Sequence, residues 1–247
     1  MSKEIALCLS GGGARGAIHV GVLKYLEDEG YQIKSIAGTS IGALIGVMIA
    51  SGMSSDQILN LMGTKAIRHF VKASFSSRNA LFNMSGVRKI LNEHIPHNDL
   101  EKLEIPLIAC STNLSKDEAS YISTGKLDDA VIASCSIPIV FDPINIDGDL
   151  HCDGGLLNNL PVQALIDQPH TKLAVHVNNY NIPELTTYKE IVQRVINVAV
   201  GHTAKEGRSI ADILIEPYLP HAYPTLDLKA TNELFNIGYN EAKKILG

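Results

Sequence analysis

A serine lies between two glycines where one apolar segment ends and a longer one begins. Gly38, Ser40 and Gly42 fit the pattern G-x-S-x-G. In this pattern a sharp turn from strand to helix exposes the serine hydroxyl, and the glycines remove side chains that would collide across the turn. The N–H of Ile41 would then point toward an anion formed at the serine. The pattern indicates a nucleophile. The structural alternative is a close approach of strand and helix, which would require the same glycines.

A second glycine-rich segment, residues 11–16, follows the first apolar run. It reads Gly-Gly-Gly-Ala-Arg-Gly, so it also fits the G-x-G-x-x-G pattern of dinucleotide-binding folds. That function requires an acidic residue after the second strand, where residues 37–39 are Ala-Gly-Thr. The other functional interpretation is an oxyanion hole formed by the N–H groups of Gly12 and Gly13, with Arg15 holding the loop or adding positive potential. A simple tight turn is the structural alternative.

A serine hydroxyl is a weak nucleophile unless a neighbouring base takes its proton. The usual order of serine, acid and histidine makes His176 and His202 candidates among nine histidines. Asp153 is followed by Gly154 and Gly155, which would let a turn expose its carboxylate. The same three residues also form ordinary Asx turns. The residues alone therefore leave the base open.

Apolar runs and turn residues predict the elements that position these motifs. Runs at 5–9 and 33–37 each enter a glycine turn, and helical spacing follows to residue 30 and to residue 52. This repeat of strand, turn and helix predicts a parallel sheet with helices on both faces. Further strands are predicted at 105–112, 119–124, 140–146, 150–152, 172–178 and 210–215, and helices at 127–134, 188–202 and 232–246.

The segment 54–95 differs in composition from its surroundings. It contains six basic and two acidic residues and three of the five phenylalanines, Phe70, Phe75 and Phe82. One interpretation is an amphipathic helical insert packed on the sheet, and the other is a cap over the site. The basic residues are Lys65, Arg68, Lys72, Arg78, Arg88 and Lys89.

Bulk composition narrows the class of protein. A chain of 247 residues with 45% hydrophobic and 19% charged residues is typical of a globular protein with a sizeable core. Its net charge of -5 argues against nucleic acid as a partner. Four cysteines without C-x-x-C spacing indicate buried thiols rather than a disulfide or zinc site. No secretory signal is evident, so we expect a cytoplasmic protein.

In combination, these motifs resemble those of patatin-like phospholipases, a family of serine lipid acyl hydrolases. Each motif is weak alone, but three of them occur here in the family's order. The small bacterial members are similar in size, and the catalytic domain of neuropathy target esterase is similar in motif layout. The matching segments are 11–16, 38–42 and 153–155, with further likeness at 133–138 (Ala-Ser-Cys-Ser-Ile-Pro), 159–162 (Asn-Leu-Pro-Val) and 238–242 (Gly-Tyr-Asn-Glu-Ala).

The resemblance implies an α/β fold, a three-layer α/β/α sandwich with a mainly parallel central sheet. We expect a single domain over 1–247 with a small helical cap insert at about 54–95. It also implies a Ser40–Asp153 dyad without histidine, no metal and no cofactor. The remaining site residues would be the oxyanion hole (Gly12, Gly13 and Ile41), the loop support (Gly11, Arg15 and Gly16), the elbow (Gly38 and Gly42) and the aspartate turn (Gly154 and Gly155).

An aspartate with a pKa of about 3.9 is a weak base near neutral pH, so the site should raise that pKa by desolvation. The implied substrate is a lipid carboxylic ester, with phospholipid or lysophospholipid as the leading class. The segment 54–95 could bind an acyl chain and bring transient, peripheral contact with an anionic membrane surface. The alternatives are a Ser-His-Asp triad esterase and a catalytically silent lipid-binding protein. Head group, acyl length and oligomeric state are not predicted.

Overall fold

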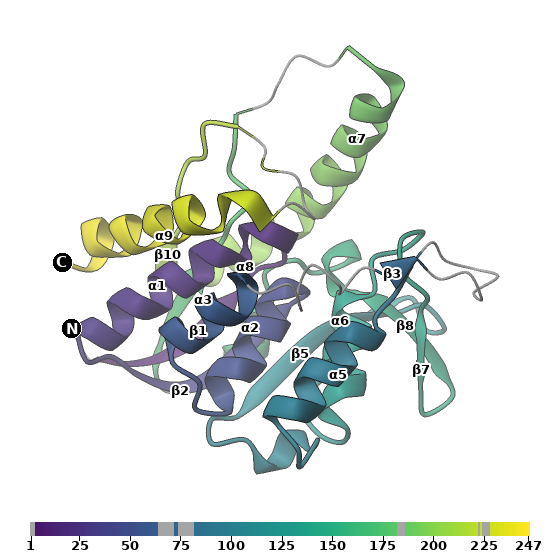
Figure 1. Ribbon diagram of the computed structural model, residues 1–247, viewed down its shortest axis with the longest axis horizontal. Coiled ribbons are helices and arrows are strands. Elements are labelled where there is room, and N and C mark those ends of the chain that lie inside the picture. Colours follow the sequence, from purple (N-terminus) through teal and green to yellow (C-terminus); the bar gives the residue numbers. More distant parts are fainter. Residues whose placement is uncertain (1–2, 64–71, 74–81, 182–185, 222, 224–227) are drawn as a thin grey trace.

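A central eight-stranded sheet organises the chain (Figure 1). The computed structural model describes residues 3–63, 72–73, 82–181, 186–221, 223 and 228–247. The strands follow one another across the sheet in the order β10-β9-β1-β2-β5-β8-β7, and β6 pairs with β5. They are β1 (Glu4–Leu9), β2 (Gln32–Thr39), β5 (Leu107–Asn113), β6 (Glu118–Ile122), β7 (Ile144–Ile146), β8 (Asp149–Asp153), β9 (Thr171–Val175) and β10 (Ile213–Ile215).

The strands from β10 to β5 all run parallel, whereas β6, β7 and β8 form antiparallel pairs at the β5 end of the sheet. This confirms the predicted α/β class with a mainly parallel sheet, and every strand predicted from the sequence is present. The structure also has a small ribbon of β3 (Lys72–Ala73) and β4 (Phe82–Asn83).

The predicted helices are present with small shifts of their ends. The last, α9, packs along α1 beside both chain ends (Figure 1). Short 3-10 turns add η1 (Gly13–Gly16), η2 (Leu100–Lys102), η3 (Gly154–Leu156), η4 (Val162–Leu165) and η5 (Leu228–Ala230). The helices are α1 (Ala17–Asp28), α2 (Ile41–Ala50), α3 (Ser55–Gly63), α5 (Ser85–His94), α6 (Leu127–Cys135), α7 (Tyr188–Thr203), α8 (Lys205–Ile210) and α9 (Thr231–Leu246).

The two faces of the sheet carry side chains of different size. Successive residues of a strand point to opposite faces, and in β1 the large Ile5, Leu7 and Leu9 join the main core with α1, α2 and α6. The small Ala6 and Cys8 face a second cluster, where η4 and α8 pack. The sandwich thus has three layers: the central sheet, a thick helical layer on the face of Ile5, Leu7 and Leu9, and a thin layer on the face of Ala6 and Cys8.

The ends of the segment 54–95 pack into the body of the protein. Ile58 of α3 and Val87 and Leu91 of α5 are buried in the main core. Residues 64–71 and 74–81, which include Phe70 and Phe75, lie outside the described residues. The cap over the site therefore stays a prediction.

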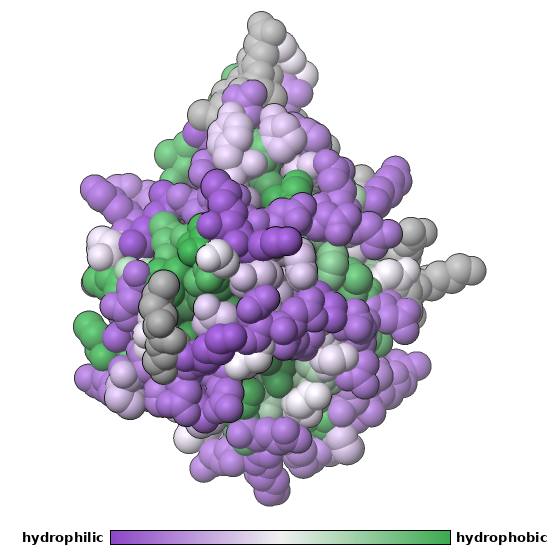
Figure 2. All heavy atoms as spheres, turned by 90° about the vertical axis from the view of Figure 1, so that its left-hand side faces the viewer, coloured by the Kyte–Doolittle hydropathy of each residue, from purple (hydrophilic) through white to green (hydrophobic). Residues whose placement is uncertain are grey.

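The face of the molecule that carries both chain ends is covered mainly by hydrophilic side chains, with hydrophobic ones in smaller groups (Figure 2). Among the described helices, none combines the length and the apolar character needed to cross a bilayer. All four cysteines are free and buried, as the sequence predicts.

Candidate active site

Ser40 lies at the turn between β2 and α2. Its φ of 55° and ψ of −124° are a conformation that residues with a side chain rarely adopt, and such strain is typical of nucleophile turns. The turn requires glycine at position 42, because a Cβ atom there would lie 2.2 Å from the carbonyl oxygen of Leu9. A Cβ on Gly38 would lie 2.5 Å from the carbonyl carbon of Gly42. Ser40 therefore lies on a tight turn from strand to helix that leaves no room for side chains at positions 38 and 42.

Strand β5 brings Ser40 and Asp153 together. Thr39, which ends β2, pairs with Cys110, and Asp153, which ends β8, pairs with the next β5 residue, Ser111. Strand β6 occupies the other edge of this stretch of β5, so β2 and β8 share one edge. Because β2 runs parallel to β5 and β8 runs antiparallel, their last residues approach each other end to end.

The carboxyl group of Asp153 is buried, with the residue 7% exposed. Its Oδ1 accepts the N–H of Gly155 at 2.8 Å. Burial raises the pKa of Asp153 to about 6, and the neighbouring Ser40 side chain and the Gly155 N–H oppose part of that rise. Gly154 lets the turn approach β5, since a Cβ there would lie 2.3 Å from the Cys110 carbonyl oxygen. A carboxylate with this pKa can accept a proton near neutral pH.

The glycine loop passes beside the serine. A Cβ on Gly11 would lie 3.3 Å from the Cβ of Ser40, and the Gly11 N–H donates to the Asn159 carbonyl at 3.1 Å. Within the described part of the chain, the N–H groups of Gly12, Gly13 and Ile41 have no protein acceptor. Unpaired donors on the segments that flank a serine are what a developing oxyanion requires.

Two contacts hold the elbow from either side. Ser134 of α6 accepts the Ser40 N–H at 2.8 Å and donates to the Cys110 carbonyl at 2.6 Å. On the other side, Gly16 lets η1 pack against α2, because a Cβ there would lie 2.4 Å from Cγ1 of Ile41. Sequence reasoning did not single out Ser134, and its only signal was the family-like block that contains it.

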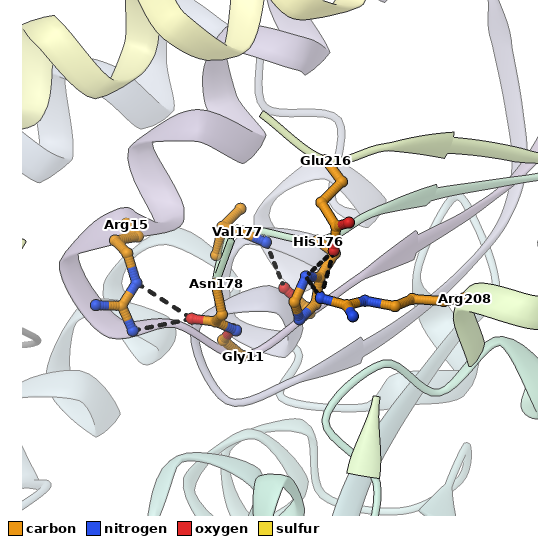
Figure 3. Close-up of polar contacts among 8 residues, drawn as sticks. Gly11, Arg15, His176, Val177, Asn178, Arg208 and Glu216 are labelled. Carbon is orange, nitrogen blue, oxygen red and sulfur yellow. Dashed lines mark hydrogen bonds and ion pairs between the residues drawn. The ribbon is translucent and has the colours of Figure 1, made fainter. Parts of the chain in front are cut away.

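Arg15 is buried and clamps the glycine loop rather than facing the site. Its Nε and Nη2 donate to Oδ1 of Asn178 at 3.1 and 2.9 Å (Figure 3). Its Nη1 donates to the Tyr223 carbonyl at 2.8 Å. The guanidinium also lies 5.4 Å from the ring centroid of Tyr180. These contacts tie the glycine loop to residues 178 and 223.

Asn178 is a site residue that sequence reasoning missed. Its Nδ2 donates to the Gly11 carbonyl oxygen at 2.7 Å, while its Oδ1 accepts from Arg15. A trans peptide is planar, so the carbonyl of Gly11 and the N–H of Gly12 point in opposite directions. By holding the carbonyl, Asn178 sets the direction of the Gly12 N–H. In the sequence it is only the last residue of the strand predicted at 172–178, whereas β9 ends at Val175 and leaves Asn178 in the loop that follows.

The two candidate histidines are not brought to the serine. His176 is buried, and its Nδ1 lies 2.6 Å from Oε1 of Glu216 and 3.1 Å from Nη2 of Arg208 (Figure 3). Burial lowers the pKa of His176, and the hydrogen bond with Glu216 opposes that change. His202 is exposed on α7. Among the described hydrogen bonds, none joins either histidine to Ser40 or Asp153.

Among the described residues, no group of three or more His, Cys, Asp or Glu side chains is arranged to hold a metal ion.

Several known proteins are similar to this chain in sequence. A protein of Mycobacterium tuberculosis named as an uncharacterized NTE family protein is 34% identical over 66% of this chain and 46% of its own length. Lysophospholipase NTE1 of Coccidioides immitis is 27% identical over 99% of this chain and 18% of its own. Human patatin-like phospholipase domain-containing protein 6 is 26% identical over 99% and 20%. The chain thus spans less than half the length of these relatives.

Solved structures share the fold at low sequence identity. VipD from Legionella pneumophila superposes with a TM-score of 0.59 at 14% identity, covering 98% of this chain and 66% of that one. ExoU, in its complex with SpcU from Pseudomonas aeruginosa, gives a TM-score of 0.53 at 18% identity, covering 99% and 51%. A family model described as patatin-like phospholipase matches residues 7–166, which include the elbow, the glycine loop and the aspartate turn. The chain belongs to the patatin-like phospholipase family.

Proposed function

We propose that this chain hydrolyses carboxylic esters of lipids through a Ser40–Asp153 dyad. The observation that carries the proposal is the meeting of β2 and β8 end to end on β5, which places Ser40 beside the buried carboxylate of Asp153, whose pKa is raised. Family membership supports the reaction class, and a relative that aligns with 99% of the chain is named a lysophospholipase. Phospholipids and lysophospholipids are therefore the proposed substrates.

The proposed reaction has two halves. Asp153 takes the hydroxyl proton while Ser40 Oγ attacks the ester carbonyl, and the negative oxygen of the tetrahedral intermediate binds the N–H groups of Gly12, Gly13 and Ile41. The intermediate collapses to an acyl-serine, and Asp153 returns the proton to the departing alcohol. Water then attacks the acyl-serine with Asp153 again as base, which releases the fatty acid and restores the hydroxyl.

The surroundings of Asp153 favour a dyad over a triad. In a triad the carboxylate would bind a histidine, which would in turn contact the serine. The groups that perturb the pKa of Asp153 are instead the Ser40 side chain and the Gly155 N–H, with burial as the largest cause. A pKa of about 6 lies close enough to neutral pH for general base catalysis.

Fatty acid release from lysophosphatidylcholine, together with hydrolysis of a chromogenic short-chain ester, tests the proposal. We expect both reactions with the native chain and neither with Ser40→Ala. His202→Ala should retain the native rate, and His176→Ala should retain it per folded molecule. Loss of activity in a folded histidine variant would favour the triad. Saturable lipid binding without any hydrolysis would favour a silent lipid-binding protein.

A further inference from the structure

Helix α7 exposes most of its large apolar side chains. Figure 1 shows it projecting from the body of the molecule, and its main contacts are with η3 and α8 at its C-terminal end. Isolated exposed apolar residues are normal, but a contiguous set of them on one element marks an interaction site. The exposed fractions run from 39% to 83% for Val192, Ile196, Ile191, Val198, Val195 and Tyr188.

Helix α7 has an apolar face that is not packed on the core. Tyr188, Ile191, Val192 and Val195 have the i, i+3, i+4, i+7 spacing that places them on one face, and that face is exposed. Arg194, between them in sequence, is only half-exposed. A soluble helix normally shows solvent its charged residues, so this face is suited to a nonaqueous neighbour.

The start of α7 is stabilised by residues of the helix itself. A complete capping box begins it, in which Thr187 accepts the Glu190 N–H and the Glu190 side chain accepts the Thr187 N–H. Such a box stabilises a helix start without tertiary contacts.

The C-terminal end of α7 is attached to the turn that carries Asp153. Thr203 Oγ1 donates to the Gly155 carbonyl at 3.1 Å and accepts the Asn159 N–H at 3.1 Å. Beside this junction, Leu156 and Leu157 are 45% and 40% exposed. We call the exposed apolar side chains of α7, together with Leu156 and Leu157, the α7 ridge. It leads from the tip of α7 to the aspartate turn.

We propose that the α7 ridge docks the protein on the surface of a lipid bilayer. This proposal rests on the proposed function, because a lipid ester resides in the same phase that the ridge is suited to enter. A helix of this length is about 24 Å long and about 10 Å wide, so two copies packed face to face would bury well under the ~1,200 Å² of a standard protein interface. An amphipathic helix needs no such area to bind lipid, because its apolar face sinks into the bilayer boundary.

The charge of α7 distinguishes binding through the α7 ridge from binding through the basic segment 54–95. Helix α7 has Lys189 and Arg194 against Glu190, so little electrostatic attraction is available. Binding through the ridge should therefore occur on zwitterionic vesicles and persist in 0.5 M salt, a concentration that screens surface charges within a few ångströms. Binding through the basic segment 54–95 should instead require anionic lipid and disappear in that salt.

Vesicle flotation tests the surface without turnover. The Ser40→Ala protein should float with phosphatidylcholine vesicles at low and high salt. Adding Ile191→Asp and Val195→Asp should weaken binding about 30-fold, because two charges would enter an apolar boundary. The control is Asn236→Asp with Asn240→Asp, which adds the same charge to exposed positions of α9. Equal binding by both double variants would overturn the proposal.

A fluorescence measurement tests contact at a single position. The chain contains no tryptophan, so Val195→Trp supplies the sole indole. Its emission should shift to the blue on addition of phosphatidylcholine vesicles, and brominated lipid should quench it, whereas Asn236→Trp should show neither change. An unshifted Val195→Trp spectrum with bound vesicles would refute the proposal. A blue shift that grows with protein concentration without lipid would replace the bilayer with a second copy of the chain.

The hydrolysis of a water-soluble short-chain ester separates the two proposals. Activity on this ester without ridge-dependent vesicle binding would overturn the docking surface and leave the proposed function standing. Ridge-dependent binding in a chain that hydrolyses no ester would support the surface and overturn the function.

Discussion

Replacing Asn178 with aspartate should turn the Gly12 N–H away from the oxyanion while keeping the contact between residue 178 and Arg15. Aspartate has nearly the same shape and still accepts from Arg15, whose Nε and Nη2 lie 3.1 and 2.9 Å from the Asn178 oxygen. It cannot donate to the Gly11 carbonyl, which now receives a hydrogen bond 2.7 Å long. Two acceptor oxygens at that separation repel, so the Gly11–Gly12 peptide should rotate and carry the Gly12 N–H away from the site.

The size of the effect follows from the role of that N–H. Removing one oxyanion donor costs about 10²- to 10³-fold in kcat. Since Gly13 and Ile41 would remain as donors, we expect the lower end, about 10²-fold or about 2.7 kcal/mol of transition-state stabilisation. KM should change by less than about 3-fold, because the interaction forms with the oxyanion rather than with the bound ester.

Steady-state kinetics on a short-chain ester measure both constants, and a thermal melt monitors the fold. Asn179→Asp is the matched control, since it makes the same change one residue further along. A kcat for Asn178→Asp close to that of this control would refute the positioning role. A raised KM at constant kcat would also refute it.

Three further predictions concern the site. The constant kcat/KM should rise with pH through an apparent pKa near 6, that of Asp153. The native state holds this proton up to about pH 6 and the unfolded state only to about pH 3.8, so the free energy of unfolding should fall by about 3 kcal/mol as the pH rises between these values. For the same reason, Asp153→Asn should melt at a higher temperature than the native chain at pH 8. Gly42→Ala, which places a Cβ 2.2 Å from a carbonyl oxygen, should destabilise by more than about 3 kcal/mol in urea unfolding, whereas Gly63→Ala, with open space around it, should change stability by under about 1 kcal/mol. Ser134→Ala should destabilise by about 1–3 kcal/mol and lower kcat by leaving the buried Ser40 N–H unpaired, while Ser136→Ala, whose hydroxyl bonds only within its own helix end, should keep kcat unchanged.

The sequence predicted the elements well because their signals are local. The apolar runs that end at Gly11 and Gly38 and the helical spacing after them need no knowledge of the rest of the chain. The small side chains of Ala6 and Cys8 also follow from the sequence, but the thin helical layer that they permit depends on η4 and α8, which arrive from more than 150 residues away.

The contacts that hold the site were not predictable in the same way. Asn178 lies 167 residues from Gly11, and Ser134 lies 94 residues from Ser40. No sequence period or motif links such pairs. They meet because of the order of the strands in the sheet and because β2 and β8 pair with the same edge of β5. Likewise, the spacing of 188–202 predicts a helix but not that its apolar face is exposed.

Reaction of Ser40 with a fluorophosphonate tests the central claim most directly, because the reagent forms a covalent bond only with an activated serine. We expect intact mass and peptide mapping to show a single adduct on Ser40, formed at least about 10³-fold more slowly in Asp153→Asn, the extent typical of losing a catalytic base. An adduct on another residue, or equal labelling rates in the native chain and in Asp153→Asn, would contradict the account.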